Sequence, residues 1–166
     1  MTTRRNLIGS LIGLATAGVA SRAFAQAPAA IGEIRVDLSE LRAKGWGSPP
    51  LGVIDASLRS GLRSAFAGRL GGGPALVVRI TAVQLSGFAG GPGGGARFGN
   101  GFGGQNDYMD GELLLVGRGG SIISRQPLLN AMPSQISAAW WDEKGELKRL
   151  AALSSSYAYW ARRQLG

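Results

Sequence analysis

Three carboxylates lie close together in the second half of the chain, and their type and spacing could support chemistry. They are Asp107, Asp110 and Glu112. Two carboxyl groups about 5 to 9 Å apart can hydrolyse a glycosidic bond when one has a raised pKa. The same group could hold a cation with loop carbonyls, although its spacing does not match a calcium-binding loop. We assign no catalytic residue and keep these three as candidates, beside the alternative of an acidic strand start exposed to solvent.

The chain contains no cysteine and no histidine, which removes most other catalytic chemistry. Without cysteine there is no disulfide framework, no thiol nucleophile and no thiolate metal site. Without histidine there is no Ser-His-Asp relay and no imidazole ligand for zinc or iron. We therefore predict no metal site and no cofactor.

A glycine-rich segment, residues 87–105, contains the pattern G-x-G-x-x-G at positions 99–104. A dinucleotide site needs a strand before this pattern and a helix start after it. Here a strand-like stretch follows, so no helix N-terminus is available for a pyrophosphate. A phosphate-binding P-loop is excluded because no Gly-Lys-Ser/Thr is present. We expect the segment to be a flexible loop, because fixing so many glycines has a high entropic cost.

Aromatic residues in and after this loop are the binding candidates. Phe88, Phe98 and Phe102 are spaced through the loop, with Arg97 beside Phe98. They could grip a partner, or the loop could be a flexible insertion without a ligand. Two further candidates are the adjacent residues Trp140 and Trp141. One could pack against the core while the other contacts a sugar or a protein.

The chain is basic, with 18 lysine and arginine residues against 10 aspartate and glutamate residues and a net charge of +8. Three of the arginines lie in residues 1–25, so a chain without that segment has a net charge of about +5. This charge is compatible with an anionic partner but is also met in ordinary solvated surfaces.

Hydrophobic periodicity predicts four strands and two helices. The strands are expected at residues 31–41, 74–86, 107–118 and 121–130, with a hairpin turn at Gly119 and Gly120. The helices are expected at residues 51–70 and 142–165, with Asp142 as the N-cap of the second. In the strand at 74–86, alternation places Ala82 on the face of Ile80 and Val83 on the opposite face. The predicted fold is α+β, with a four-stranded, mainly antiparallel sheet and two helices on one face.

The first 25 residues have the features of a cleaved export signal. Arg4 and Arg5 precede an apolar run, and Ala23-Phe24-Ala25 provides a signal-peptidase site. The run Thr3-Arg4-Arg5-Asn6-Leu7-Ile8 resembles the S/T-R-R-x-Φ-Φ core of twin-arginine signal peptides. The resemblance implies export of a folded protein by the twin-arginine machinery, cleavage by signal peptidase and a periplasmic location. Residues 26–166 would then form a single exported domain without a stable transmembrane helix.

The element order of this domain loosely resembles small periplasmic α+β domains that assist envelope assembly, although those proteins carry a lipid-bearing cysteine that is absent here. We expect a non-enzymatic envelope protein that binds or scaffolds a protein or an anionic envelope polymer. The alternative is an envelope hydrolase that uses the carboxylates near residue 110. Export argues against nucleic acid as the partner.

Overall fold

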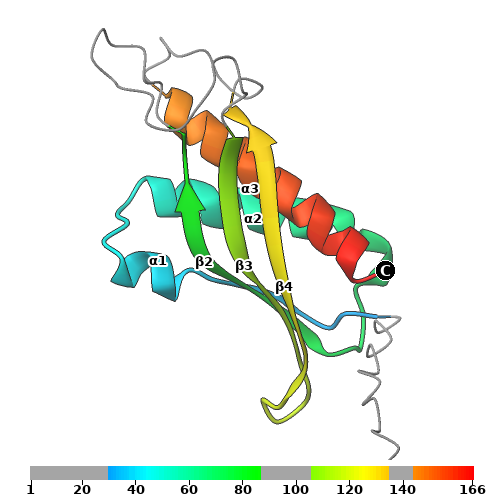
Figure 1. Cartoon of the computed structure of the whole chain (residues 1–166). Helices are drawn as coiled ribbons and strands as arrows, with labels where there is room; N and C mark the ends of the chain where they lie inside the picture. The colour runs from blue at the N-terminus through cyan, green and yellow to red at the C-terminus, as the bar shows by residue number, and fades with distance from the viewer. Residues whose placement is uncertain (1–29, 87–105, 135–143) are drawn as a thin grey trace, which may run out of the picture.

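A four-stranded sheet lies at the centre of the protein, and two long helices cover one of its faces (Figure 1). The computed structural model describes residues 30–86, 106–134 and 144–166. The strands are β1 (Ile34–Asp37), β2 (Ala75–Gln84), β3 (Asn106–Val116) and β4 (Ile122–Pro133). The helices are α1 (Ser39–Ala43), α2 (Pro50–Ala65) and α3 (Gly145–Gln164), with a short 3-10 helix at Ala67–Arg69. The α+β class predicted from the sequence is confirmed.

The strands follow one another across the sheet in the order β1-β2-β3-β4. β1 and β2 are parallel and are connected through α1 and α2, whereas β2–β3 and β3–β4 are antiparallel. Gly119 and Gly120 form the β3–β4 turn with φ values of +90° and +84°, which glycine adopts without strain. This confirms the predicted hairpin and places β4 at the edge of the described sheet.

A bulge in β2 determines which of its side chains face the helices. Ile80 pairs with Gly111, and Ala82 pairs with the neighbouring Asp110. Thr81 therefore has no partner in the ladder. One extra residue shifts the alternation of side chains by one position. Val83 therefore packs on the helix side with Ile80, and Ala82 faces outward. The strict alternation predicted from the sequence is wrong beyond Thr81.

The core lies between the inner face of the sheet and the helices α2 and α3. In α2 the four-residue spacing of Ile54, Leu58 and Leu62 produces one buried stripe, as predicted. The sheet, α3 and the residue after α2 complete this core with the following buried residues: Leu76, Val78, Ile80, Leu113, Leu115, Leu150, Leu153, Tyr157, Ala158, Ala161 and Phe66. In residues 30–86, 106–134 and 144–166, no helix has the length and apolarity needed to span a bilayer.

Several element boundaries differ from the predicted ones. The first strand is limited to Ile34–Asp37, because the Asp37 carboxylate accepts a hydrogen bond from the Ser39 amide and the chain turns into α1. The helix predicted at 51–70 ends at Ala65 and continues as the 3-10 turn. α3 begins at Gly145 rather than at Asp142, which lies outside the described residues, and β4 extends through Pro133.

Some large apolar side chains lie on the surface of the described residues. Trp160 of α3 is 44% exposed. Ile123 of β4 lies next to the hairpin turn. A register shift pairs Ser124 with Leu115 and Ile122 with Val116, which leaves Ile123 without a partner and exposed.

Candidate functional site

The three candidate carboxylates are divided between the two faces of the sheet. Asp107 points to the helix side of β3 and is fully buried, whereas Asp110 and Glu112 lie on the outer face. This follows from the alternation of side chains along β3, in which residues 107 and 110 have opposite parity. The structure therefore does not bring Asp107 together with the other two. No cluster of three or more potential metal ligands occurs within the described ranges.

Asp107 belongs to a buried ion pair that connects three elements. Its carboxylate accepts two hydrogen bonds from Arg149 of α3, one of them at 2.9 Å from Nε. It also accepts one from the Ser86 amide at 2.9 Å, and Arg149 in turn donates to the Ser86 carbonyl at 2.9 Å. The Ser86 hydroxyl donates to the Asn106 carbonyl. The pair thus joins the end of β2 to the start of β3 and to α3, which is a structural role.

Glu112 belongs to a row of alternating charges that crosses all four strands on the outer face. Arg79 donates to Asp37 at 2.9 Å and lies 3.9 Å from Glu112, which accepts from Arg125 at 3.3 Å. Hydrogen bonds from the Ser39 side chain and amide, with a smaller contribution from Arg79, lower the pKa of Asp37 below its usual value. The ionised form of Asp37 is therefore favoured, which is the opposite of what a general acid requires.

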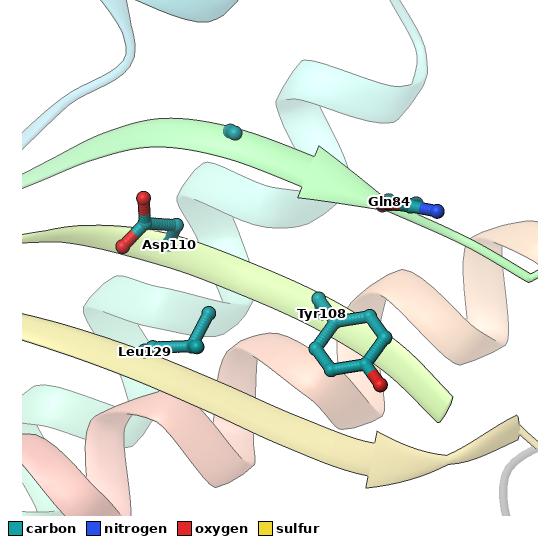
Figure 2. Close-up of a pocket in the computed structure, with 5 residues that line it drawn as sticks. Gln84, Tyr108, Asp110 and Leu129 are labelled. Atoms are coloured by element: carbon teal, nitrogen blue, oxygen red, sulfur yellow. The ribbon is translucent and has the colours of Figure 1, made fainter. Parts of the chain in front are cut away.

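Asp110 lies in a hollow on the same outer face, next to the row of charges. The hollow has a volume of about 310 Å³ and is lined by Ala82, Gln84, Tyr108, Asp110 and Leu129. Figure 2 shows these side chains on three neighbouring strands, with Tyr108 and Asp110 projecting from β3 and Leu129 from β4. Tyr108 is 37% exposed and Leu129 is 63% exposed. Asp110 forms no ion pair with any residue that the structure describes.

The lining of this hollow resembles a contact surface in its composition. It offers an aromatic ring, an aliphatic side chain, an amide and one carboxylate, a mixture common in protein contact surfaces. Of the other two candidate carboxylates, Glu112 lies on the same face but is paired with Arg79 and Arg125, and Asp107 lies on the opposite face. No helix in the described part of the chain covers this face (Figure 1). We call the five lining residues the outer-face hollow.

All of the binding residues predicted from the sequence lie outside the described residues. These are Phe88, Arg97, Phe98, Phe102, Trp140 and Trp141, together with the signal residues Arg4, Arg5, Ala23 and Ala25. Their predicted roles stay predictions.

Sequence reasoning did not select Tyr108 and Leu129. A signal for Leu129 was present, because it alternates with Leu128 and Asn130 in a strand whose other face must be buried. An apolar residue at the solvent parity of an edge strand is a mark of a contact surface. The sequence gives no such signal for Ala82. The bulge at Thr81 moves its side chain to the outer face, and the sequence pattern does not show the bulge.

No protein-family model matches the chain, and neither a curated protein nor a solved structure shows a significant match.

Proposed function

We propose that this chain is an exported bacterial envelope protein that acts by binding a partner, and that the outer face of its sheet makes the contact. The export part rests on Arg4, Arg5 and the Ala23-Phe24-Ala25 site. The binding part rests on one structural observation. The outer-face hollow presents Tyr108 and Leu129 to solvent on a sheet whose other face is already packed against α2 and α3.

The composition of the hollow favours a protein as the partner over an anionic polymer. Asp110 would repel the phosphate or carboxylate groups of such a polymer at the centre of the contact. It would attract an amide, hydroxyl or basic group of a protein. Tyr108 adds a large contact area and loses little side-chain entropy when it is bound.

Nothing in the described residues favours the hydrolase alternative. Asp107 is engaged by Arg149, and Glu112 is engaged by Arg79 and Arg125. Asp110 is then the one of the three candidates without an ion pair among the described residues.

Two variants test the two parts of this proposal. The double variant Arg4→Lys/Arg5→Lys should accumulate as an uncleaved cytoplasmic precursor, whereas the native chain should be periplasmic and begin at Gln26. The double variant Tyr108→Ala/Leu129→Ala should lose envelope proteins that the native chain retains in affinity isolation, while Arg63→Ala on the exposed side of α2 retains them. Export of the lysine variant would overturn the twin-arginine assignment. Equal retention by the alanine variant would overturn the contact surface.

A further inference from the structure

The outer edge of β4 offers a short window of free backbone groups. The Pro127 carbonyl accepts a hydrogen bond from Gln164 of α3, so the backbone groups of residue 127 point away from β3. Backbone groups alternate in direction along a strand. Leu129 and Ala131 therefore direct their N–H and C=O groups outward as well, and neither group has a partner among the described residues.

Prolines limit this window on both sides. Pro127 and Pro133 occupy the flanking outward positions and have no N–H to donate. Between the two prolines, an added strand can therefore form a full set of hydrogen bonds at Leu129 and Ala131. Prolines of this kind protect an edge strand against unlimited pairing with other sheets. The edge of β4 can thus accept a short added strand, but not a long one.

A groove accompanies this window on the helix side. It has a volume of about 330 Å³ and lies between residues 128–131 of β4 and Trp160 and Gln164 of α3. The Trp160 ring is 44% exposed and packs edge-on against Tyr159, with ring centroids 5.7 Å apart. A strand added beside β4 would project alternate side chains toward this ring. The groove therefore provides an apolar contact next to the backbone window.

The charge beside the groove is positive. The Arg163 guanidinium lies 5.1 Å from the centre of the Trp160 ring and 5.9 Å from that of Tyr159. Arg163 forms no salt bridge with a carboxylate in the described part of the chain. A second copy of this basic chain would bring another Arg163 and a further positive charge to the edge. An acidic partner is the better electrostatic complement.

We propose that an extended segment of a partner protein, carrying an apolar residue for Trp160 and an acidic residue for Arg163, adds to β4 as a fifth strand at Leu129 and Ala131. This inference rests on the proposed binding function and specifies how part of the partner is held. Strand addition of this kind takes its affinity from main-chain hydrogen bonds and its specificity from alternate side chains.

The test uses the purified full chain and a phage-displayed library of random octapeptides. Selected peptides should combine an apolar and an acidic residue. Ala131→Pro should weaken their binding at least tenfold, because it removes an outward N–H and places a ring where the added strand would lie. Ala131→Val is the matched control, since it enlarges the side chain and keeps the N–H, and it should change affinity less than threefold. Trp160→Ala should weaken binding at least tenfold.

Three results would overturn the proposal. They are a failure to select any peptide, equal binding by Ala131→Pro, and a native dimer in sedimentation velocity that Ala131→Pro dissociates, which would make a second copy the occupant. If Ala131→Pro does not fold, amide hydrogen exchange of the native chain decides. Saturating peptide should slow exchange at Leu129 and Ala131, and unchanged rates would refute strand addition. Trp160 lies outside the outer-face hollow, so loss of peptide binding by Trp160→Ala reports on the edge, whereas affinity isolation of envelope proteins with Tyr108→Ala reports on the hollow. Arg63→Ala, on the exposed side of α2, should leave peptide affinity unchanged.

Discussion

At the scale of single residues, the buried pair of Asp107 and Arg149 has the largest structural effect. Asp107 is fully buried, and the side chain of Arg149 is only 12% exposed. Removing one partner of a buried pair leaves the other charge without compensation, which typically costs 3–5 kcal/mol. The pair also fixes Ser86 and Asn106, the two residues on either side of the glycine-rich segment.

Asp107→Asn should therefore lower the free energy of unfolding by about 3 kcal/mol, because Arg149 would remain buried without a countercharge. Urea denaturation measures this change. Asp110→Asn is the matched control, since Asp110 is exposed on the outer face and its replacement should cost less than about 0.5 kcal/mol. Equal effects of the two substitutions would contradict the structural role of Asp107.

Tyr157 is a buried residue whose hydroxyl has no hydrogen-bond partner in the described part of the chain. Burial, with smaller contributions from Asp110 and Glu112, raises the pKa of this hydroxyl well above its ordinary value of 10.0. The folded state therefore retains the proton at a pH where the unfolded state loses it. The contribution of Tyr157 to stability is complete below about pH 10 and declines as the pH rises above that value.

Tyr157→Phe should remove this alkaline decline. Urea denaturation at pH 8 and pH 11 should show the variant gaining about 1 kcal/mol relative to the native chain between the two values. At pH 8 the variant should be at least as stable as the native chain, because it removes an unsatisfied hydroxyl from the core. Parallel pH profiles for the two proteins would refute the raised pKa.

The sequence identified Asp107 as a possible catalytic group but could not reveal its partner. Arg149 lies 42 positions away, and only the packing of α3 against the sheet brings the two together. Asp107 was predicted as the first residue of its strand, and burial is hard to predict from sequence at a strand end. The sequence could nevertheless have placed Asp107 on the same face as Leu113, because both are odd-numbered residues of one strand.

At the scale of elements, the contact between α2 and α3 depends on Gly61. A Cβ atom at this position would lie 2.9 Å from the Ala158 Cβ, which is closer than side-chain carbons normally approach. In an isolated helix, a glycine at this position would only lower helix propensity. The structure shows that the missing side chain allows the two helices to approach each other.

Two substitutions in the same helix should therefore have opposite effects. Gly61→Ala should destabilise the protein by about 1–3 kcal/mol, because the added methyl group forces α2 and α3 apart. Gly52→Ala, at an exposed site with no atom within 4 Å, should stabilise it by up to about 1 kcal/mol through helix propensity alone. Thermal unfolding followed by circular dichroism compares the two, and a stabilising Gly61→Ala would contradict the close helix contact.

The types and order of the elements were predictable, and their ends and local irregularities were not. The four-residue spacing from Ile54 to Phe66 predicted the helix α2. The run of β-branched residues in β2 predicted a strand. The bulge at Thr81 leaves no trace in composition, because it depends on how β2 and β3 fit together. The short helix α1 was missed because the apolar residues Leu38 and Leu41 were also consistent with a continuing strand.

At the scale of the whole molecule, a sheet with one packed face and one open face accounts for the proposed function. Helices α2 and α3 bury the inner face, whereas the outer face and the edge of β4 are described surfaces that stay open to a partner (Figure 1). Leu129 belongs to both the outer-face hollow and the edge groove. One partner could therefore occupy the two sites together.

Site-specific photo-cross-linking in living cells tests the central claim most directly. A photoreactive amino acid replaces Tyr108 in the outer-face hollow or, as a control, Ser64 on the exposed side of α2. The account predicts a discrete cross-linked product in the envelope fraction for position 108 and none for position 64. The absence of a product at position 108, or the same products at both positions, would contradict it.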